Sequence, residues 1–195
     1  MASYKGLQGA LLALEEHLRR RLPDELRGGP VNAQVALLGS TDIGRPLSAN
    51  LLGVYLHRVV IDPHGRSRHF PPQGADPRGP QPELPVNLHI LILAVGSSAT
   101  IEADLLGWAM VELANEGQID VSEIAGTDSD WGEREILTVT PEEMSTEDLM
   151  RIWDVFEAQY TNSVPYVLRT VRLRLRRPLA EGPPVKTRVY PGGEL

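Results

Sequence analysis

Histidine is the residue type of this 195-residue chain best suited to metal binding, and there are five. Of these, His57, His64 and His69 lie close together in sequence. No two histidines have the i, i+4 spacing that places both imidazoles on one helix face, and no HExxH motif occurs. In addition, His64 and His69 fall in a proline-rich segment that does not fix ligand geometry. The sequence therefore predicts no metal site.

Acidic and serine residues give no positive case for catalysis. Carboxylate pairs for acid–base chemistry could be drawn from Asp128 and Asp130, or from Glu142 and Glu143, but the sequence offers no apolar pocket to separate their pKa values. The nucleophile motif GxSxG is absent. Residues 39–46 (GSTDIGRP) are similar to a phosphate loop but lack its closing Gly-Lys-Ser/Thr. We therefore expect no catalytic residue, no cofactor and no small-molecule substrate, and the chain is predicted not to be an enzyme.

The most distinctive polar pattern is a series of arginines in residues 164–176, which alternate with apolar residues as in a strand with one face in the core. The apolar face is predicted to hold Val167, Val171, Leu173 and Leu175, and the basic face Arg172, Arg174 and Arg176. A net charge of -7, an aromatic content of 5% and the lack of a binding motif argue against nucleic acid. Guanidinium groups form directed pairs with carboxylates, so we expect an acidic protein surface as their partner.

Charge is divided unevenly along the chain. Residues 100–150 contain fourteen acids and a single base, Arg134, whereas residues 1–99 and 151–195 are each net positive. Two interpretations are open. The acids form a solvated surface, or acidic and basic regions pair between copies or neighbouring subunits.

The composition is that of one soluble globular unit. The length suffices to bury a core without disulfides, and 42% hydrophobic and 23% charged residues are typical of a folded protein. The absence of cysteine excludes a disulfide framework and a thiolate metal site. Glu15, Glu16 and His17 interrupt the N-terminal apolar run, and no stretch is long enough to span a bilayer. We expect a protein made in the cytoplasm without a signal peptide, and no membrane partner.

Three helices are predicted from apolar residues at helical spacing. The first begins near Leu7 and ends before Pro23, and the second begins in residues 97–100 and ends at Gly117. The third follows Ser145, which forms a variant capping box with the aspartate three residues later.

Strands are predicted at residues 31–38, 50–61, 86–95, 136–140 and 164–176. The segment 86–95 (VNLHILILAV) is the most apolar, so it should be a central strand covered on both faces in its C-terminal half. Together these elements predict an α+β fold, with a mixed, mainly antiparallel β-sheet packed with about three α-helices.

Three segments fall outside this predicted core. Residues 62–85 are rich in proline and glycine and are predicted to form a projecting arm, which either binds a partner or is a disordered connector. Residues 118–134 are acidic and weakly patterned, and we expect a loop there. Residues 1–176 then form a single domain, and residues 177–195 form an extended C-terminal tail that a partner would order.

Five stretches, taken in order, resemble the tail-terminator or cap proteins of phage-tail-like extracellular contractile injection systems, of the antifeeding-prophage and virulence-cassette type. The stretches are GVYLHRVVID, LPVNLHILILAV, DLLGWAMVEL, LTVTPEEMSTEDLMRIWDVF and QYTNSVPYVLRTVRLRL. With the first helix they span most of residues 7–176. The resemblance implies a tail-terminator-like fold.

The resemblance also implies a function: a structural cap that forms a ring, a homohexamer, which ends polymerisation of inner tube and sheath and joins the two. The partners would be other copies of the chain and the tube and sheath subunits, and the protein would be a component of an assembled injection particle, cytoplasmic or released. The alternative is an adaptor or chaperone-like module of the same assembly pathway that forms no ring. From charge and position, the subunit interface is predicted to include Arg169, Arg172, Arg174, Arg176, Glu142 and Glu143.

Overall fold

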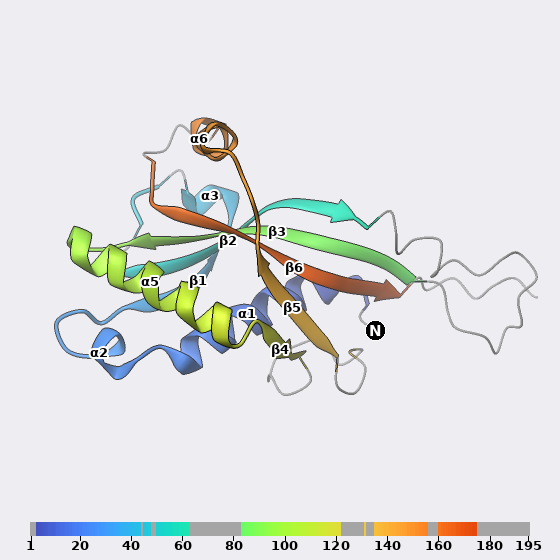
Figure 1. The fold of residues 1–195 in the computed structure, drawn as a ribbon, viewed down its shortest axis with the longest axis horizontal. Coiled ribbons are helices and arrows are strands. Elements are labelled where there is room, and N and C mark those ends of the chain that lie inside the picture. The colour runs from blue at the N-terminus through green and yellow to red at the C-terminus, as the bar shows by residue number, and fades with distance from the viewer. Residues whose placement is uncertain are drawn as a thin grey trace, which may run out of the picture.

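The computed structural model describes residues 3–43, 45–47, 50–62, 83–121, 131, 135–155 and 160–174. These residues form one six-stranded sheet and five helices, which confirms the predicted α+β class (Figure 1). The strands are β1 (Gln34–Leu38), β2 (Leu51–Ile61), β3 (Glu83–Val95), β4 (Gln118–Asp120), β5 (Ile136–Pro141) and β6 (Ser163–Arg174). The helices are α1 (Gly6–Arg21), α2 (Asp24–Arg27), α3 (Ser40–Ile43), α5 (Ala99–Asn115) and α6 (Thr146–Val155).

The sheet is mixed and mainly antiparallel, as predicted. Its strand order is β1-β2-β3-β6-β5-β4, in which only β1 and β2 run parallel. At 13 residues β3 is the longest strand, and it lies between β2 and β6. Its central place agrees with the apolar run of residues 90–95 (ILILAV), since a strand buried on both faces has no solvated side that requires polar residues.

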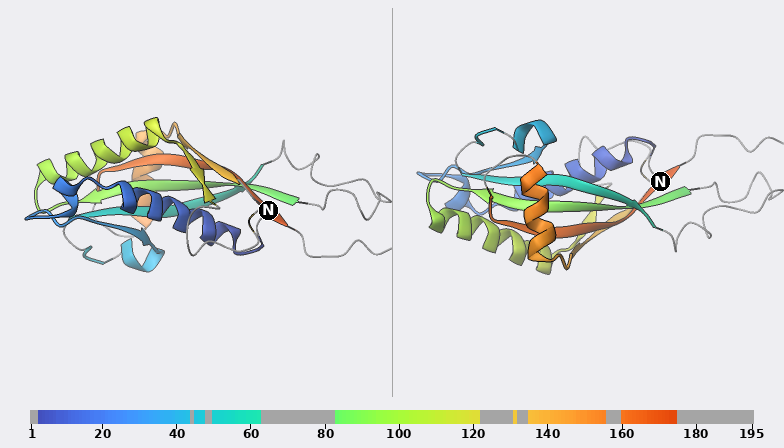
Figure 2. Two further views of the ribbon diagram at one scale, coloured as in Figure 1. Left: turned by 90° about the horizontal axis from the view of Figure 1, so that it is seen from below. Right: turned by 90° about the horizontal axis from the view of Figure 1, so that it is seen from above.

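Helices cover both faces of the sheet (Figures 1 and 2). The long helices α1 and α5 lie side by side on one face, whereas α3 and α6 lie on the other, with α6 crossing the strands (Figure 2). We call these the α1/α5 face and the α6 face. Three layers result, with one hydrophobic core on each side of the sheet.

Alternate residues of β3 supply both cores. Leu88, Ile90 and Ile92 are fully or almost fully buried against the α1/α5 side, while Leu91 and Leu93 are fully buried against the α6 side. The prediction that this strand is covered on both faces in its C-terminal half is therefore confirmed. On the α6 side, Leu91 and Leu93 share their core with Trp153 of α6, Ile43 of α3 and Tyr55 of β2.

The two predicted N-caps are present. The Ser98 hydroxyl accepts a hydrogen bond from the Ile101 amide at 3.4 Å at the start of α5. The Ser145 hydroxyl accepts one from the Asp148 amide at 3.1 Å, which is the N-cap bond of the predicted capping box at the start of α6. The Asp148 carboxylate accepts from the Ser145 hydroxyl at 2.7 Å, and the reciprocal bond of a capping box, from the Ser145 amide, is not among the described hydrogen bonds.

Several boundaries differ from the predictions. β3 begins at Glu83, so residues 83–85 of the predicted arm 62–85 belong to a strand. Pro85 lacks an amide donor but keeps its place in the ladder because its carbonyl accepts from the Asp62 amide at 3.0 Å. The start of the predicted loop 118–134 forms β4, a strand too short to show alternation. The one-turn helices α2 and α3 were also not predicted, since four residues are too few to show a helical period.

The rest of the predicted arm, residues 63–82, and the predicted C-terminal tail 177–195 lie outside the described residues. Within the described ranges, no helix is both long enough and apolar enough to cross a membrane.

Candidate functional site

The α6 face of the sheet is apolar under α6 and polar beyond it. The polar part consists of Arg58, His89, Glu142, Arg169 and Arg172, and we call it the polar half-face. His89 shares a face with Leu91 because alternate residues of a strand point the same way, and Arg58 lies opposite His89 in the register of β2 and β3. Three of the six residues predicted for the subunit interface, Glu142, Arg169 and Arg172, thus belong to one surface.

Two β-bulges shape the polar half-face. The register between β2 and β3 shifts between Leu56 and Arg58, and that between β3 and β6 shifts between Val86 and Leu88. In the second bulge Arg169 and Thr170 of β6 lie opposite one residue of β3. An extra residue reverses which face the following side chains occupy, and bulges are common beside functional sites.

Because of this bulge, the strict alternation predicted for residues 164–176 is wrong. Leu168 and Val171 are both in the core of the α1/α5 side, so the residues between them do not follow strict alternation. Val167 is buried but lies on the opposite face from Val171, although both were predicted on one face. Because the inserted residue falls between Arg169 and Arg172, both arginines remain on the α6 face.

The predicted interface residues fall into three groups. Arg169, Arg172 and Glu143 are exposed, and none has a side-chain ion pair in the described part of the chain. The backbone of Arg174 pairs with Glu83 at the end of β6. Nothing is described of the Arg174 side chain, and Arg176 lies outside the described residues. The interface assignment itself remains a prediction.

Glu142, by contrast, is engaged within the chain. Its side chain is 13% exposed, and its Oε1 accepts a hydrogen bond from the Arg58 guanidinium at 2.9 Å. His89 Nδ1 lies 2.8 Å from the same oxygen. Since β2, β3 and the residue after β5 each supply one member, this network ties three strands together across the polar half-face.

His57 is a fourth, buried member of the network. Its Nε2 lies 4.0 Å from Glu142 Oε2, beyond hydrogen-bonding distance, and neither atom has a hydrogen-bond partner in the described part of the chain. Its ring meets that of His89 edge-on, with centroids 6.1 Å apart. Burial lowers the pKa of His57, and the neighbouring Glu142 carboxylate opposes that shift only in part.

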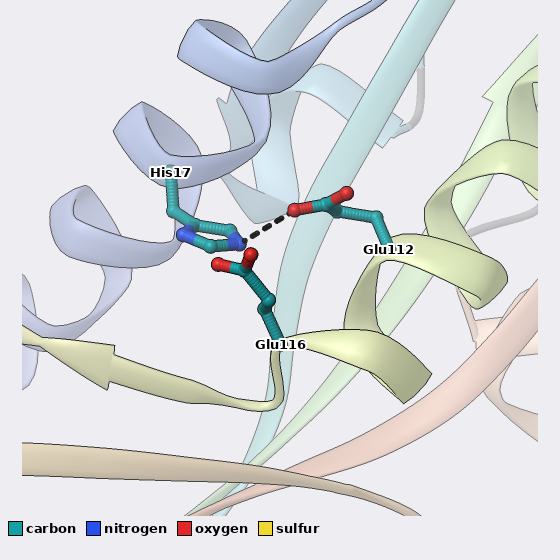
Figure 3. A group of neighbouring side chains, drawn as sticks. All are labelled: His17, Glu112 and Glu116. Carbon is teal, nitrogen blue, oxygen red and sulfur yellow. Dashed lines mark ion pairs between the residues drawn. The ribbon is translucent and has the colours of Figure 1, made fainter.

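A second histidine–carboxylate cluster lies on the opposite side of the sheet, between α1 and α5 (Figure 3). His17 of α1 points at Glu112 and Glu116, which are one turn apart on α5 and its C-cap. His17 Nε2 is 3.3 Å from Glu112 Oε1, and the guanidinium of Arg21 contacts both carboxylates. Sequence reasoning missed this cluster, because His17 and Glu112 meet only through packing of two helices that are distant in sequence.

The two clusters differ in what they could bind. One ligand atom from each of His17, Glu112 and Glu116 lies within 4.8 Å of the others, and this is the one such three-residue group among the described residues. His64 and His69, considered above as metal ligands, lie outside the described residues. The exposed arginines of the polar half-face are suited to carboxylates of another protein surface.

Two solved proteins of contractile injection systems share this fold. The structure is similar to the "PVC sheath/tube terminator in extended state" of an extracellular contractile injection system, with a TM-score of 0.62 and 19% identity over 96% of this chain and 62% of that chain. It is also similar to the "anti-feeding prophage cap (AFP tube terminating cap)", with a TM-score of 0.60 and 16% identity over 93% of this chain and 59% of that one.

The chain belongs to the Pvc16 N-terminal domain family, which matches residues 12–187. This confirms the resemblance to the tail-terminator family and the predicted fold class. The chain spans about three fifths of the length of the two solved relatives. No curated protein sequence is significantly similar to it.

Proposed function

We propose that this chain is the terminator subunit of a contractile injection system, and that copies of it form a ring that ends the growth of tube and sheath and joins the two. The observation that carries the proposal is membership of the Pvc16 N-terminal domain family together with a fold shared with two terminating caps. Tubes and sheaths grow by head-to-tail contacts that do not close, so growth stops when a subunit offers one docking surface but not the next.

The role is structural rather than catalytic. The polar half-face is organised around Glu142, one oxygen of which is already held by Arg58 and His89. A carboxylate bound in this way is suited to fixing strands in place. The exposed guanidinium groups of Arg169 and Arg172 are then the groups free to contact a neighbour.

The acidic partner of these arginines is the surface of α6 and the turn before it. Glu143, Glu147 and Asp148 are exposed there, and the same helix exposes the apolar residues Met150 and Val155. Apolar contact area surrounded by charge is typical of a protein interface. In the proposed ring, the basic end of β6 of one copy contacts α6 of the next, so that each copy contributes one surface of each sign.

A charge-swap experiment tests this head-to-tail contact. Copies carrying Arg169→Glu with Arg172→Glu, or copies carrying Glu143→Arg with Glu147→Arg, should each fail to form rings, because like charges meet at every interface. An equimolar mixture of the two should assemble, because opposite charges then meet at every interface of an alternating ring. The measurement is particle mass and negative-stain imaging at high protein concentration.

The control is Lys5→Glu, which makes the same kind of charge change at an exposed residue at the start of α1, on the α1/α5 face. It should leave ring formation unchanged. If both double variants form rings as well as the wild type does, the arginines are not at the interface. If the wild type remains monomeric at every concentration, the adaptor or chaperone-like alternative is favoured.

A further inference from the structure

The cluster of His17, Glu112 and Glu116 has the arrangement of a metal site (Figure 3). The two glutamates are four residues apart and lie on the side of α5 that meets α1, so both carboxylates approach the imidazole of His17. The separation of His17 Nε2 and Glu112 Oε1 is 3.3 Å. Two ligand atoms of a tetrahedral zinc ion are also about 3.3 Å apart, given metal–ligand distances of about 2.0 Å.

Two buried atoms of this cluster make ion-pair contacts but no hydrogen bond among the described residues. His17 Nε2 and Glu112 Oε1 are shielded from solvent and have no hydrogen bond, although they face each other. The His17 side chain is only 9% exposed and that of Glu112 15%. A buried polar atom without a partner destabilises the folded state by about 1–3 kcal/mol. A cation between the two atoms would give both a partner.

Arg21 is the competing cation. Its guanidinium lies 3.4 Å from Glu112 and also contacts Glu116, so it neutralises carboxylates that would otherwise repel each other. The Arg21 side chain is 44% exposed and sits at the end of α1, so it can turn into solvent when another cation binds.

We propose that His17, Glu112 and Glu116 bind a divalent zinc ion, with Arg21 displaced and the fourth position taken by water. Histidine nitrogen and glutamate oxygen are both ligands of zinc, and three protein ligands with water in the fourth position is the arrangement of its open sites. The ion would fasten α1 to α5 on one face of the sheet. This proposal does not depend on the terminator function, since the cluster lies on the face opposite the polar half-face.

Zinc titration of the full chain, freed of metal by a chelator, tests the proposal by calorimetry and thermal unfolding. The wild type should bind one equivalent of zinc at this site and unfold at a higher temperature with zinc. His17→Ala and the milder Glu116→Gln should each weaken binding by about 100-fold or more, since even outer-shell changes cost 10- to 100-fold. Arg21→Gln should bind about tenfold more tightly, because a competing unit charge is removed.

Two controls separate this site from other carboxylates and histidines. Glu147→Gln changes an exposed glutamate on α6, and His57→Gln changes the buried histidine beside Glu142; both should bind zinc as the wild type does. Glu116 is half-exposed, so Glu116→Gln should fold even if His17→Ala does not. The proposal is overturned if the wild type binds no zinc, or if Glu116→Gln binds zinc as tightly as the wild type does.

Discussion

Two clusters of nearly the same residue types lie on opposite faces of one sheet and have different local chemistry. On the α6 face, Glu142 Oε1 accepts a hydrogen bond from the Arg58 guanidinium at 2.9 Å and lies 2.8 Å from His89 Nδ1. On the α1/α5 face, Glu112 lies 3.3 Å from His17 and 3.4 Å from Arg21 without a hydrogen bond to its buried oxygen. Composition is thus a poor guide to role.

The difference arises from the elements that supply the residues. Arg58 and His89 come from adjacent strands, whose register places their side chains opposite each other at fixed spacing. The relative positions of side chains on packed helices are determined by the contact between the helices instead. In the helix cluster, His17 faces two carboxylates one turn apart. In the strand cluster one carboxylate oxygen of Glu142 is held by both Arg58 and His89, whereas in the helix cluster the approach of His17 to Glu112 is an ion-pair contact without a hydrogen bond. Each cluster also keeps one histidine nitrogen and one carboxylate oxygen without a hydrogen bond among the described residues.

The largest expected effect on stability is at the strand cluster. Glu142→Ala leaves Arg58 and His89 without their shared acceptor, so the free energy of unfolding should fall by about 2 kcal/mol, as expected for hydrogen bonds to a charged group. Glu143→Ala, at the exposed neighbouring residue, should change it by less than about 0.5 kcal/mol. Denaturant unfolding measures both, and equal losses for the two variants would mean that the network contributes nothing.

A smaller effect, shared by both clusters, is a loss of stability in mild acid. Burial lowers the folded-state pKa of His17 and of His57 below the ordinary value of 6.5. The unfolded chain therefore binds more protons than the folded one as pH falls below 6.5, and the free energy of unfolding decreases with it. With a chelator present, unfolding from pH 7.5 to 5.5 should show this decrease.

Variants assign the acid effect to each cluster. His17→Gln and His57→Gln should each weaken the pH dependence of the free energy of unfolding, and the double variant should weaken it more than either single variant. An unchanged slope in both single variants would show that these two imidazoles are not the groups that take up the protons.

The next-largest expected loss in the free energy of unfolding is at the helix cluster without metal. Glu112→Gln should lower the free energy of unfolding by about 1 kcal/mol in the presence of chelator, because Arg21 keeps its contact with Glu116 and only a long contact is lost. A loss as large as that of Glu142→Ala would mean that the carboxylates of the two clusters stabilise the fold equally. The same denaturant measurement with zinc should show a larger loss, because the ligand set is then incomplete.

The smallest expected change in the free energy of unfolding concerns an ion pair outside both clusters. Glu147 and Arg151 form an exposed i, i+4 ion pair on α6, with 2.6 Å between the Arg151 guanidinium and Glu147 Oε1. Glu147→Gln should change the free energy of unfolding by about 0.3 kcal/mol, and less at high salt. A change above 1 kcal/mol in the isolated monomer would indicate a contact of α6 beyond this pair.

Local patterns made most of the fold predictable. The apolar run of 86–95 indicated a central strand buried on both faces, and Ser145 with Asp148 indicated the start of α6. Such features depend on neighbours in sequence, so the sequence alone contains them. The terminator family was likewise predictable, because the order of five stretches along the chain is more specific than any one of them.

Features set by tertiary contact were not predictable. The bulge that puts Val167 and Val171 on opposite faces depends on how β6 pairs with β3, which no alternation along β6 reveals. Glu142 was predicted at the subunit interface, and its contact with Arg58 and His89 within the chain was not predicted. The meeting of His17 with Glu112 depends on the packing of α1 beside α5, and short strands such as β4 carry too few residues for a period.

The central claim, that the chain ends tube and sheath growth, is tested most directly by the length of assembled particles. The gene is deleted from a producing cell, and the tails are imaged and measured against the wild type and against a complemented strain. Without the protein the tails are expected to be overlong or irregular, and on complementation they should be uniform. Particles of normal, uniform length in its absence would show that the chain does not end tube and sheath growth.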